Sequence, residues 1–183
     1  MNNFGLDIWS NNNFIIEDGQ IRLNYKCMPS LLQIVEDIRS DDVRGPILLR
    51  FPHLIKSQIR TLYSYFDKAI QQNNYKGKFN AVFPLKVNQF PHAVEAVTSQ
   101  GAQYNYGLED GSKAELVLDM SKTTIGANIT VNGFKDREMI TLGFIAAQSG
   151  HNITITIEGL GELETIIDVA KECDLKVPNI GIR

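Results

Sequence analysis

The sequence predicts an α/β fold in which short parallel strands alternate with helices, preceded by a separate hairpin and helix. Short apolar runs bounded by turn residues recur along the chain, and stripes with helical spacing lie between them. From Phe79 onward a new run starts about every 25 residues, roughly the size of one strand–helix unit in an eightfold barrel. Several runs are nearly continuous in apolar character, which is typical of parallel strands covered on both faces.

Residues 1–44 are predicted to form the leading element. Phe14–Ile16 and Ile21–Leu23 flank Asp18-Gly19, a pair that favours a hairpin turn with positive φ at both central positions. Ser30 is expected to cap a short helix. The apolar face of that helix comprises Leu31, Ile34, Val35 and Ile38.

From Gly45 to Arg183 expected strands and helices alternate. The strands are expected at Pro46–Phe51, Phe79–Phe83, Tyr104–Tyr106, Ile129–Val131, Ile153–Ile157 and Asn179–Ile182. Helical stripes run through Ile55 to Ile70, Ile140 to Ala147 and Leu163 to Ala170. Ser112 and Glu115 fit a capping box, in which Ser112 accepts from the Glu115 amide and Glu115 reaches back.

About six strands are counted in this array, and the count alone does not fix the architecture. A right-handed array of strand–helix units closes at eight, whereas an open doubly wound sheet can stop at six. Arg183 follows the last expected strand directly, with no helix after it to cover that strand. We therefore expect the chain to be a fragment of a longer protein.

The bulk composition excludes several classes of function. A net charge of −3 offers no basic field for nucleic acid. The N-terminus lacks the charged and apolar regions of a signal peptide, and no apolar stretch approaches the roughly 18 residues of a membrane span. Cys27 and Cys173 lack the spacing of a disulfide framework or a zinc site, and no metal ligand set emerges. We expect a cytoplasmic protein that binds neither nucleic acid nor membrane.

Polar residues follow the expected strands, where strand–helix barrels place their chemistry. Lys86 follows the second strand in apolar surroundings, which would lower the pKa of its amine and make it a nucleophile toward an aldehyde. The alternative is a strand-end lysine whose stem packs and whose head reaches solvent, and position alone favours that alternative. Glu109 and Asp110 are adjacent, so they point in different directions and do not suggest a carboxylate dyad.

Two further polar clusters have ordinary structural interpretations. The run Asn132 to Glu138 is typical of a helix start whose acidic residues favour the helix dipole. Gly159 and Gly161 suggest a phosphate loop only weakly, because position 164 is Glu and the full glycine motif is absent.

Four segments together resemble the pyridoxal-phosphate-dependent biosynthetic arginine decarboxylases of bacteria. These are Phe83-Pro84-Leu85-Lys86-Val87-Asn88-Gln89, the run Gly107 to Leu116, the run Asn132 to Glu138, and the opening Phe4-Gly5-Leu6-Asp7-Ile8-Trp9 with Asn11-Asn12. The resemblance covers nearly the whole chain. The chain departs from the common family spelling at Asp110-Gly111 and at Phe90-Pro91-His92.

The resemblance implies an alanine-racemase-like barrel with a β-domain, to which the hairpin within residues 1–44 would belong. Residues 45–183 would then be an incomplete parallel (β/α)8 TIM-like barrel, truncated at strand six of eight. Lys86 matches the lysine that forms a Schiff base with pyridoxal 5'-phosphate. Glu109 matches a carboxylate near that lysine, and Arg183 matches an arginine near the phenolic side of the pyridoxal ring.

The implied reaction is decarboxylation of L-arginine to agmatine and CO2, a step toward polyamines such as spermidine. Mg2+ dependence is a family trait for which no ligand is apparent in this chain, and the full-length protein is expected to be a homo-oligomer, a dimer or tetramer. The missing strands would carry the phosphate loop, so the isolated chain is expected to be inactive. Two alternatives stay open: a non-catalytic homologue that keeps the barrel, and a scaffold fragment that needs a complementary chain.

Overall fold

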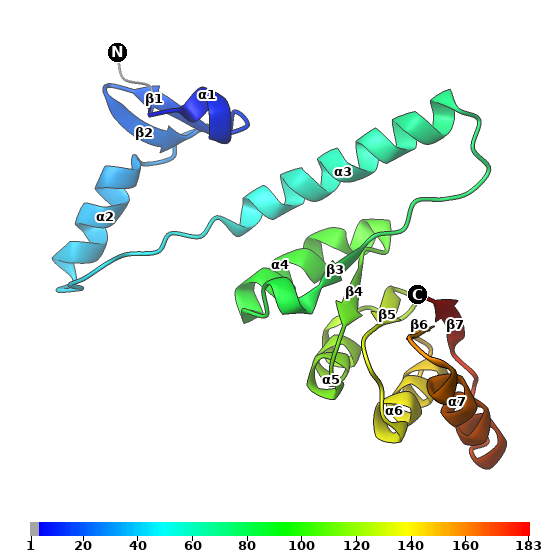
Figure 1. Ribbon diagram of the computed structural model, residues 1–183. Helices are drawn as coiled ribbons and strands as arrows, with labels where there is room; N and C mark the ends of the chain where they lie inside the picture. Colours follow the sequence, from blue (N-terminus) through cyan, green and yellow to red (C-terminus); the bar gives the residue numbers. More distant parts are fainter. Residues whose placement is uncertain (1–3) are drawn as a thin grey trace. The chain divides into compact units, whose positions relative to one another are not determined.

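The computed structural model describes residues 4–183, so residues 1–3 of the expected leading element lie outside the description. The chain forms two compact units, Met1–Phe51 and Pro52–Arg183. Figure 1 labels the helices and strands of both units. No helix in the described part of the chain is long and apolar enough to cross a membrane.

The first unit contains the predicted hairpin. Strands β1 (Phe14–Glu17) and β2 (Gln20–Leu23) pair antiparallel, with Ile16 opposite Ile21. Asp18 has φ 51° and Gly19 has φ 74°, which confirms the predicted turn with two left-handed central residues. A short helix, α1 (Leu6–Trp9), precedes the hairpin.

Helix α2 (Leu31–Ser40) completes this unit, and its predicted cap is confirmed. The Ser30 hydroxyl accepts a hydrogen bond from the Gln33 amide at 3.1 Å. This bond satisfies one of the amides that a helix start leaves without an intrahelical acceptor. None of the residues of α2 is fully buried.

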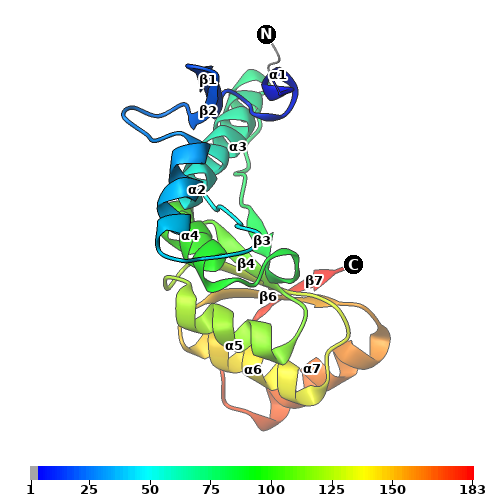
Figure 2. The same cartoon turned by 90° about the vertical axis from the view of Figure 1, so that its left-hand side faces the viewer.

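The second unit is built on a five-stranded parallel sheet in sequential order, which confirms the predicted α/β class. Its strands are β3 (Val82–Pro84), β4 (Gly107–Asp110), β5 (Asn128–Val131), β6 (Asn152–Ile157) and β7 (Asn179–Ile182). Its helices are α3 (Pro52–Gln72), η1 (Leu85–Val87), α4 (Pro91–Gly101), η2 (Ala102–Tyr104), α5 (Lys113–Lys122), α6 (Arg137–Gln148) and α7 (Leu160–Glu172). Figure 2 shows α5, α6 and α7 along the same side of the strands.

One predicted strand does not form and two are displaced, among them Phe79–Phe83, whose strand is Val82–Pro84. Pro46–Phe51 is irregular, and Leu48 within it is 72% exposed. An apolar run becomes a strand only if a partner accepts its backbone hydrogen bonds, and the sequence pattern cannot supply that partner. The parallel sheet therefore has five strands instead of about six.

The predicted strand Tyr104–Tyr106 is displaced toward the C-terminus. Tyr104 ends the turn η2, Asn105 takes a left-handed φ of 53°, and the strand begins only at Gly107. Both tyrosines pack on Tyr63 of α3, Tyr104 stacked at 4.4 Å between ring centroids and Tyr106 edge-on at 6.2 Å. Aromatic packing on a helix, not sheet pairing, thus accounts for this apolar run.

The core lies between the strands and the helices that follow them. Fully buried residues include Leu108, Ile129, Val131, Ile140, Phe144, Ile153 and Ile155. Each such side chain contributes about 1.5–3 kcal/mol relative to an exposed one. The β4–β5 contact is close: a Cβ at Gly107 would lie 1.7 Å from the Asn128 carbonyl oxygen, so only glycine fits there.

Of the two hydrogen bonds of the predicted capping box before α5, the first is confirmed and the second has a different donor. The Ser112 hydroxyl accepts from the Glu115 amide at 3.3 Å, as predicted. Glu115 reaches back one residue further than a capping box requires, and accepts from the Gly111 amide at 2.7 Å. The Gln89 side chain donates to its other oxygen at 2.6 Å, so this carboxylate joins the segment after η1 to the start of α5.

Candidate functional site

The candidate residues lie at one edge of the sheet, because parallel strands all end on the same side. Lys86 lies in η1 directly after β3, and Glu109 lies in β4. The remaining candidates directly follow the next strands along the sheet: Asn132 after β5, Glu158 after β6 and Arg183 after β7.

Lys86 and Glu109 form an ion pair across β3 and β4. The Lys86 Nζ atom lies 3.8 Å from Glu109 Oε1, and the two side chains are 63% and 22% exposed. The apolar enclosure expected for Lys86 is not observed among the described residues: Leu85 is fully buried, but Val87 is exposed. The lysine amine is therefore accessible at the edge of the sheet, held by a neighbouring carboxylate.

Asn132 fixes the position of Glu109. Its side-chain amide donates to Glu109 Oε1 at 2.6 Å, and its main-chain amide donates to the Asp110 carbonyl at 2.9 Å. The sequence placed Asn132 in a helix start, and this interpretation holds for the end of that run, where Asp136 caps α6 by accepting from the Met139 amide at 2.9 Å. The place of Asn132 directly after a strand made it a candidate, but the sequence did not indicate its contact with Glu109.

Arg183 pairs with Glu158. Its Nη1 atom donates to Glu158 Oε1 at 3.0 Å, and the same oxygen accepts the Gly133 amide at 3.0 Å. The Gly133 hydrogen bond, followed by Arg183, holds the pKa of Glu158 below its ordinary value. Glu158 therefore carries its charge at neutral pH and orients the guanidinium of Arg183.

A buried ion pair lies beside this arrangement. The side chain of Lys135 is 0% exposed, and its Nζ atom lies 3.0 Å from Glu162 Oε2 in the first turn of α7. Burial alone would raise the pKa of Glu162, but amide hydrogen bonds from Glu158 and Lys135 and the Lys135 ammonium hold it below its ordinary value. From the sequence, Lys135 was expected only to belong to a helix start, and Glu162 was assigned no role.

Asp110 and Asp119 form a second buried feature, on the side of β4 away from Glu109. Both are fully buried, and their carboxyl groups interact with each other. Burial and the neighbouring carboxyl raise the pKa of Asp110 to about 9, and burial raises that of Asp119 to about 6. The two side chains therefore retain protons that ordinary aspartates release, and they are separate from the Lys86–Glu109 pair.

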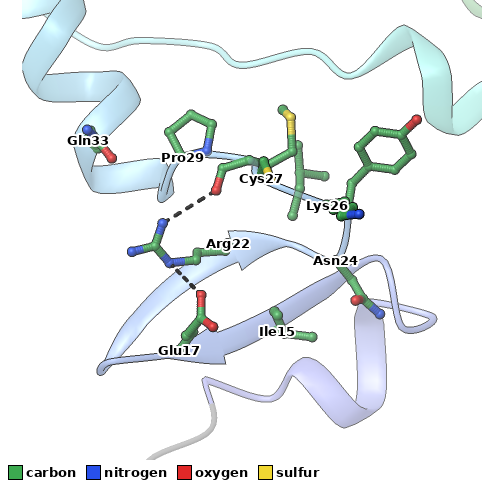
Figure 3. A pocket seen from close by; sticks show the side chains of 11 residues that line it. Ile15, Glu17, Arg22, Asn24, Lys26, Cys27, Pro29 and Gln33 are labelled. Carbon is green, nitrogen blue, oxygen red and sulfur yellow. Dashed lines mark hydrogen bonds and ion pairs between the residues drawn. The ribbon is translucent and has the colours of Figure 1, made fainter.

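A cavity of about 680 Å³ lies elsewhere, within the first unit. Figure 3 shows its lining around Arg22, whose Nε atom lies 3.2 Å from Glu17 Oε2 and whose Nη1 atom donates to the Met28 carbonyl at 3.4 Å. It contains none of the candidate residues. Across the described residues, no group of three or more His, Cys, Asp or Glu side chains is placed to hold a metal ion.

Comparison with known proteins gives a consistent set of relatives, although no family model matches the chain. It is 41% identical over 162 residues to the biosynthetic arginine decarboxylase of Citrifermentans bemidjiense, covering 87% of this chain and 25% of that protein. The biosynthetic arginine decarboxylase of Trichlorobacter lovleyi is 39% identical over 187 residues, covering 100% of this chain and 29% of that protein.

A crystal structure gives the same result. The biosynthetic arginine decarboxylase SpeA from Campylobacter jejuni matches with a TM-score of 0.95 and 58% identity, covering 98% of this chain and 30% of that one. At this identity both the fold and the sequence are shared. The chain thus spans between a quarter and three tenths of the length of these relatives.

Proposed function

This chain is a homologue of part of the biosynthetic arginine decarboxylases, and from that premise we propose that it carries the lysine-bearing part of a pyridoxal-phosphate-dependent active site. Within a complete protein, that site would convert L-arginine to agmatine and CO2, a step toward polyamines. The observation that carries the proposal is the exposed Lys86 amine held by Glu109 where parallel strands end.

The sheet supports the architecture that this function needs. Five parallel strands follow one another in sequence order, and α5, α6 and α7 lie along the same side of them. An open doubly wound sheet carries helices on both faces, whereas a barrel wall carries them on one. We propose that residues 45–183 belong to an incomplete (β/α)8 barrel and residues 1–44 to a β-domain.

The groups present fit the cofactor at two points. The Lys86 amine is exposed enough to hold an aldehyde covalently, and the Arg183 guanidinium, oriented by Glu158, keeps further N–H donors for an anionic ring oxygen. When bound, pyridoxal phosphate supplies the electron sink for loss of CO2. Glu109 Oε1 is placed to hold a proton at Lys86 Nζ, and Asn132 keeps that oxygen in position.

A chimaeric enzyme tests the substrate. This chain would replace the matching segment of the Campylobacter jejuni relative, to which it is 58% identical. We expect the chimaera to release CO2 from L-arginine faster than from ornithine or lysine, and to lose this activity with Lys86→Ala. A chimaera that folds and binds pyridoxal phosphate but leaves arginine unchanged would contradict the proposal.

A second candidate is a scaffold piece that acts only with a complementary chain. It is favoured by the ends of the sheet, because β3 and β7 each pair with one neighbouring strand among the described residues. Unpaired strand edges promote association with another chain. From the same family relationship we also propose that the isolated chain is inactive. We propose that the complete protein is a cytoplasmic homo-oligomer that requires Mg2+. Sedimentation of the chain, alone and mixed with a C-terminal part of a relative, tests this candidate. A complex that forms only in the mixture is the result that the scaffold candidate predicts.

A further inference from the structure

We infer that Glu162 is a positioning residue, which fixes Glu158 and the loop after β5 so that the Arg183 guanidinium is held at the carboxyl edge of the sheet. The inference rests on the proposed function for its purpose, since Arg183 is proposed to face the cofactor. Its geometry is independent of that function. Glu162 binds Lys135 and the Glu158 amide, and its effect on Arg183 passes through these residues.

The Glu162 carboxylate joins two loops that lie far apart in the sequence. Its Oε1 atom accepts the Lys135 amide at 2.9 Å, and its Oε2 atom accepts the Glu158 amide at 2.8 Å. Oε2 also pairs with the buried Lys135 ammonium at 3.0 Å. Lys135 donates in turn to the Gly133 carbonyl. One side chain thus fixes the loop after β5 and the residue that follows β6.

Glu158 connects Glu162 to Arg183. Its main-chain amide is fixed by Glu162, and its own Oε1 atom accepts both the Gly133 amide and the Arg183 guanidinium, each at 3.0 Å. The Arg183 amide donates to the Ile157 carbonyl at 3.2 Å, so the backbone of β7 is held at the same place. A guanidinium presents donors in a planar fork, and fixing one side of the fork orients the others.

Charge makes Glu162 the critical member of the network. Lys135 is fully buried on its side chain, and a buried ammonium without a counter-charge is strongly unfavourable. The Glu162 pKa lies below its ordinary value, so the counter-charge is present at neutral pH. Neutralising Glu162 would leave Lys135 unpaired and weaken the hold on the Glu158 amide. A purely structural pair would change stability alone, whereas a positioning residue must also change the order of Arg183.

The test compares Glu162→Gln with Glu164→Gln, a matched change at an exposed position of the same helix. The first readout needs no cofactor: hydrogen exchange of the Arg183 Nη–H groups, which include the donor to Glu158, followed by NMR in the full chain. We expect exchange about tenfold faster or more in Glu162→Gln, since an oriented, charge-assisted hydrogen bond is lost. Glu164→Gln should leave the exchange rate unchanged. Unchanged exchange in a folded Glu162→Gln would overturn the inference.

A double variant guards against a failure to fold. Lys135→Met with Glu162→Met replaces the buried pair by apolar side chains, a change that proteins often tolerate without loss of stability. We expect it to fold and still show fast Arg183 exchange. Protected exchange in the folded double variant, or unfolding of both variants, would make Glu162 a residue of the fold only and overturn the inference.

The second readout separates this inference from the proposed function. Pyridoxal phosphate is added to the chimaera with the Campylobacter jejuni relative, which supplies the strands that this chain does not span. Its covalent link to lysine is reduced with borohydride, and the modified residue is identified by mass spectrometry. We expect Glu162→Gln to need about tenfold more pyridoxal phosphate for the same yield at Lys86. If wild type is not modified at Lys86, the proposed function fails, and the Arg183 exchange alone decides the positioning role. If wild type is modified and Glu162→Gln matches it at every concentration, the positioning has no bearing on the cofactor and the inference is wrong.

Discussion

The Lys86 Nζ atom lies 3.8 Å from Glu109 Oε1, and Asn132 donates to that same oxygen at 2.6 Å. Three successive strand ends thus meet at one carboxylate oxygen. The lysine is the more exposed partner, so the pair contributes little to stability: exposed ion pairs are worth about 0–1 kcal/mol. Its significance lies in keeping a primary amine at a defined, accessible position.

Asn132 is expected to matter more through charge than through size. Asn132→Ala removes the hydrogen bond to Glu109 and should cost about 0.5–1.5 kcal/mol of unfolding free energy. Asn132→Asp should cost more at pH 7, because it places a second carboxylate against Glu109. Urea denaturation at pH 7 and pH 3 measures both variants. The excess cost of Asn132→Asp should shrink at pH 3; an excess that persists there would show that repulsion is not its cause.

The buried pair Asp110 and Asp119 predicts that stability falls as pH rises. Their folded-state pKa values, about 9 and about 6, lie above the ordinary aspartate value, so the folded chain holds protons that the unfolded chain releases. Their favourable contribution is complete below about pH 4 and is lost as the pH rises through 6 toward 9. Asp110→Asn removes the costliest ionisation and should gain on the order of a few kcal/mol over wild type at pH 8.

The measurement is the free energy of unfolding of wild type and Asp110→Asn between pH 4 and pH 9. Their difference should grow with pH, while an exposed control on α7, Asp168→Asn, should show no such trend. A difference between wild type and Asp110→Asn that stays constant over this range would rule out the retained proton.

Substitution of glycine by alanine is expected to lower stability at Gly107 and to raise it at Gly161. A Cβ at Gly107 would lie 1.7 Å from the Asn128 carbonyl, so Gly107→Ala must separate β4 from β5 and should cost several kcal/mol, on the order of the largest core substitutions. Gly161 lies in α7 with open space around it, and Gly161→Ala should stabilise the chain by up to about 1 kcal/mol. Thermal unfolding compares them. Tolerance of alanine at Gly107 would contradict the close β4–β5 approach.

Local patterns predicted local structure well. Asp18-Gly19 specified its turn and Ser30 its helix cap, because each acts on residues within one turn of itself. Pro46–Phe51 and Tyr104–Tyr106 look like strands in composition, but pairing depends on distant partners. For Tyr104, the partner is Tyr63 of α3.

For the candidate site, the sequence predicted the positions of residues along the chain but not their contacts. The rule that chemistry follows strand ends located Lys86, Glu109 and Arg183, but it could not say which of them pair. Arg183 donates to Glu158, and Glu162 binds Lys135 across 27 residues of sequence. Neither relationship has a signature in spacing, since both depend on how β5, β6 and β7 align. Glu162 could have been recognised as a candidate from its place in the first turn of a helix that follows a strand end.

The central claim is that Lys86 holds pyridoxal phosphate, and borohydride trapping tests it most directly. The chimaera with the Campylobacter jejuni relative is incubated with pyridoxal phosphate and reduced, and each modified lysine is quantified with the wild-type segment, Lys86→Ala and the exposed control Lys171→Ala. We predict that Lys86 is modified at the lowest cofactor concentration, that Lys171→Ala behaves like wild type, and that Lys86→Ala leaves only the slow labelling of surface lysines. Equal labelling of all exposed lysines, with no loss in Lys86→Ala, would contradict the account.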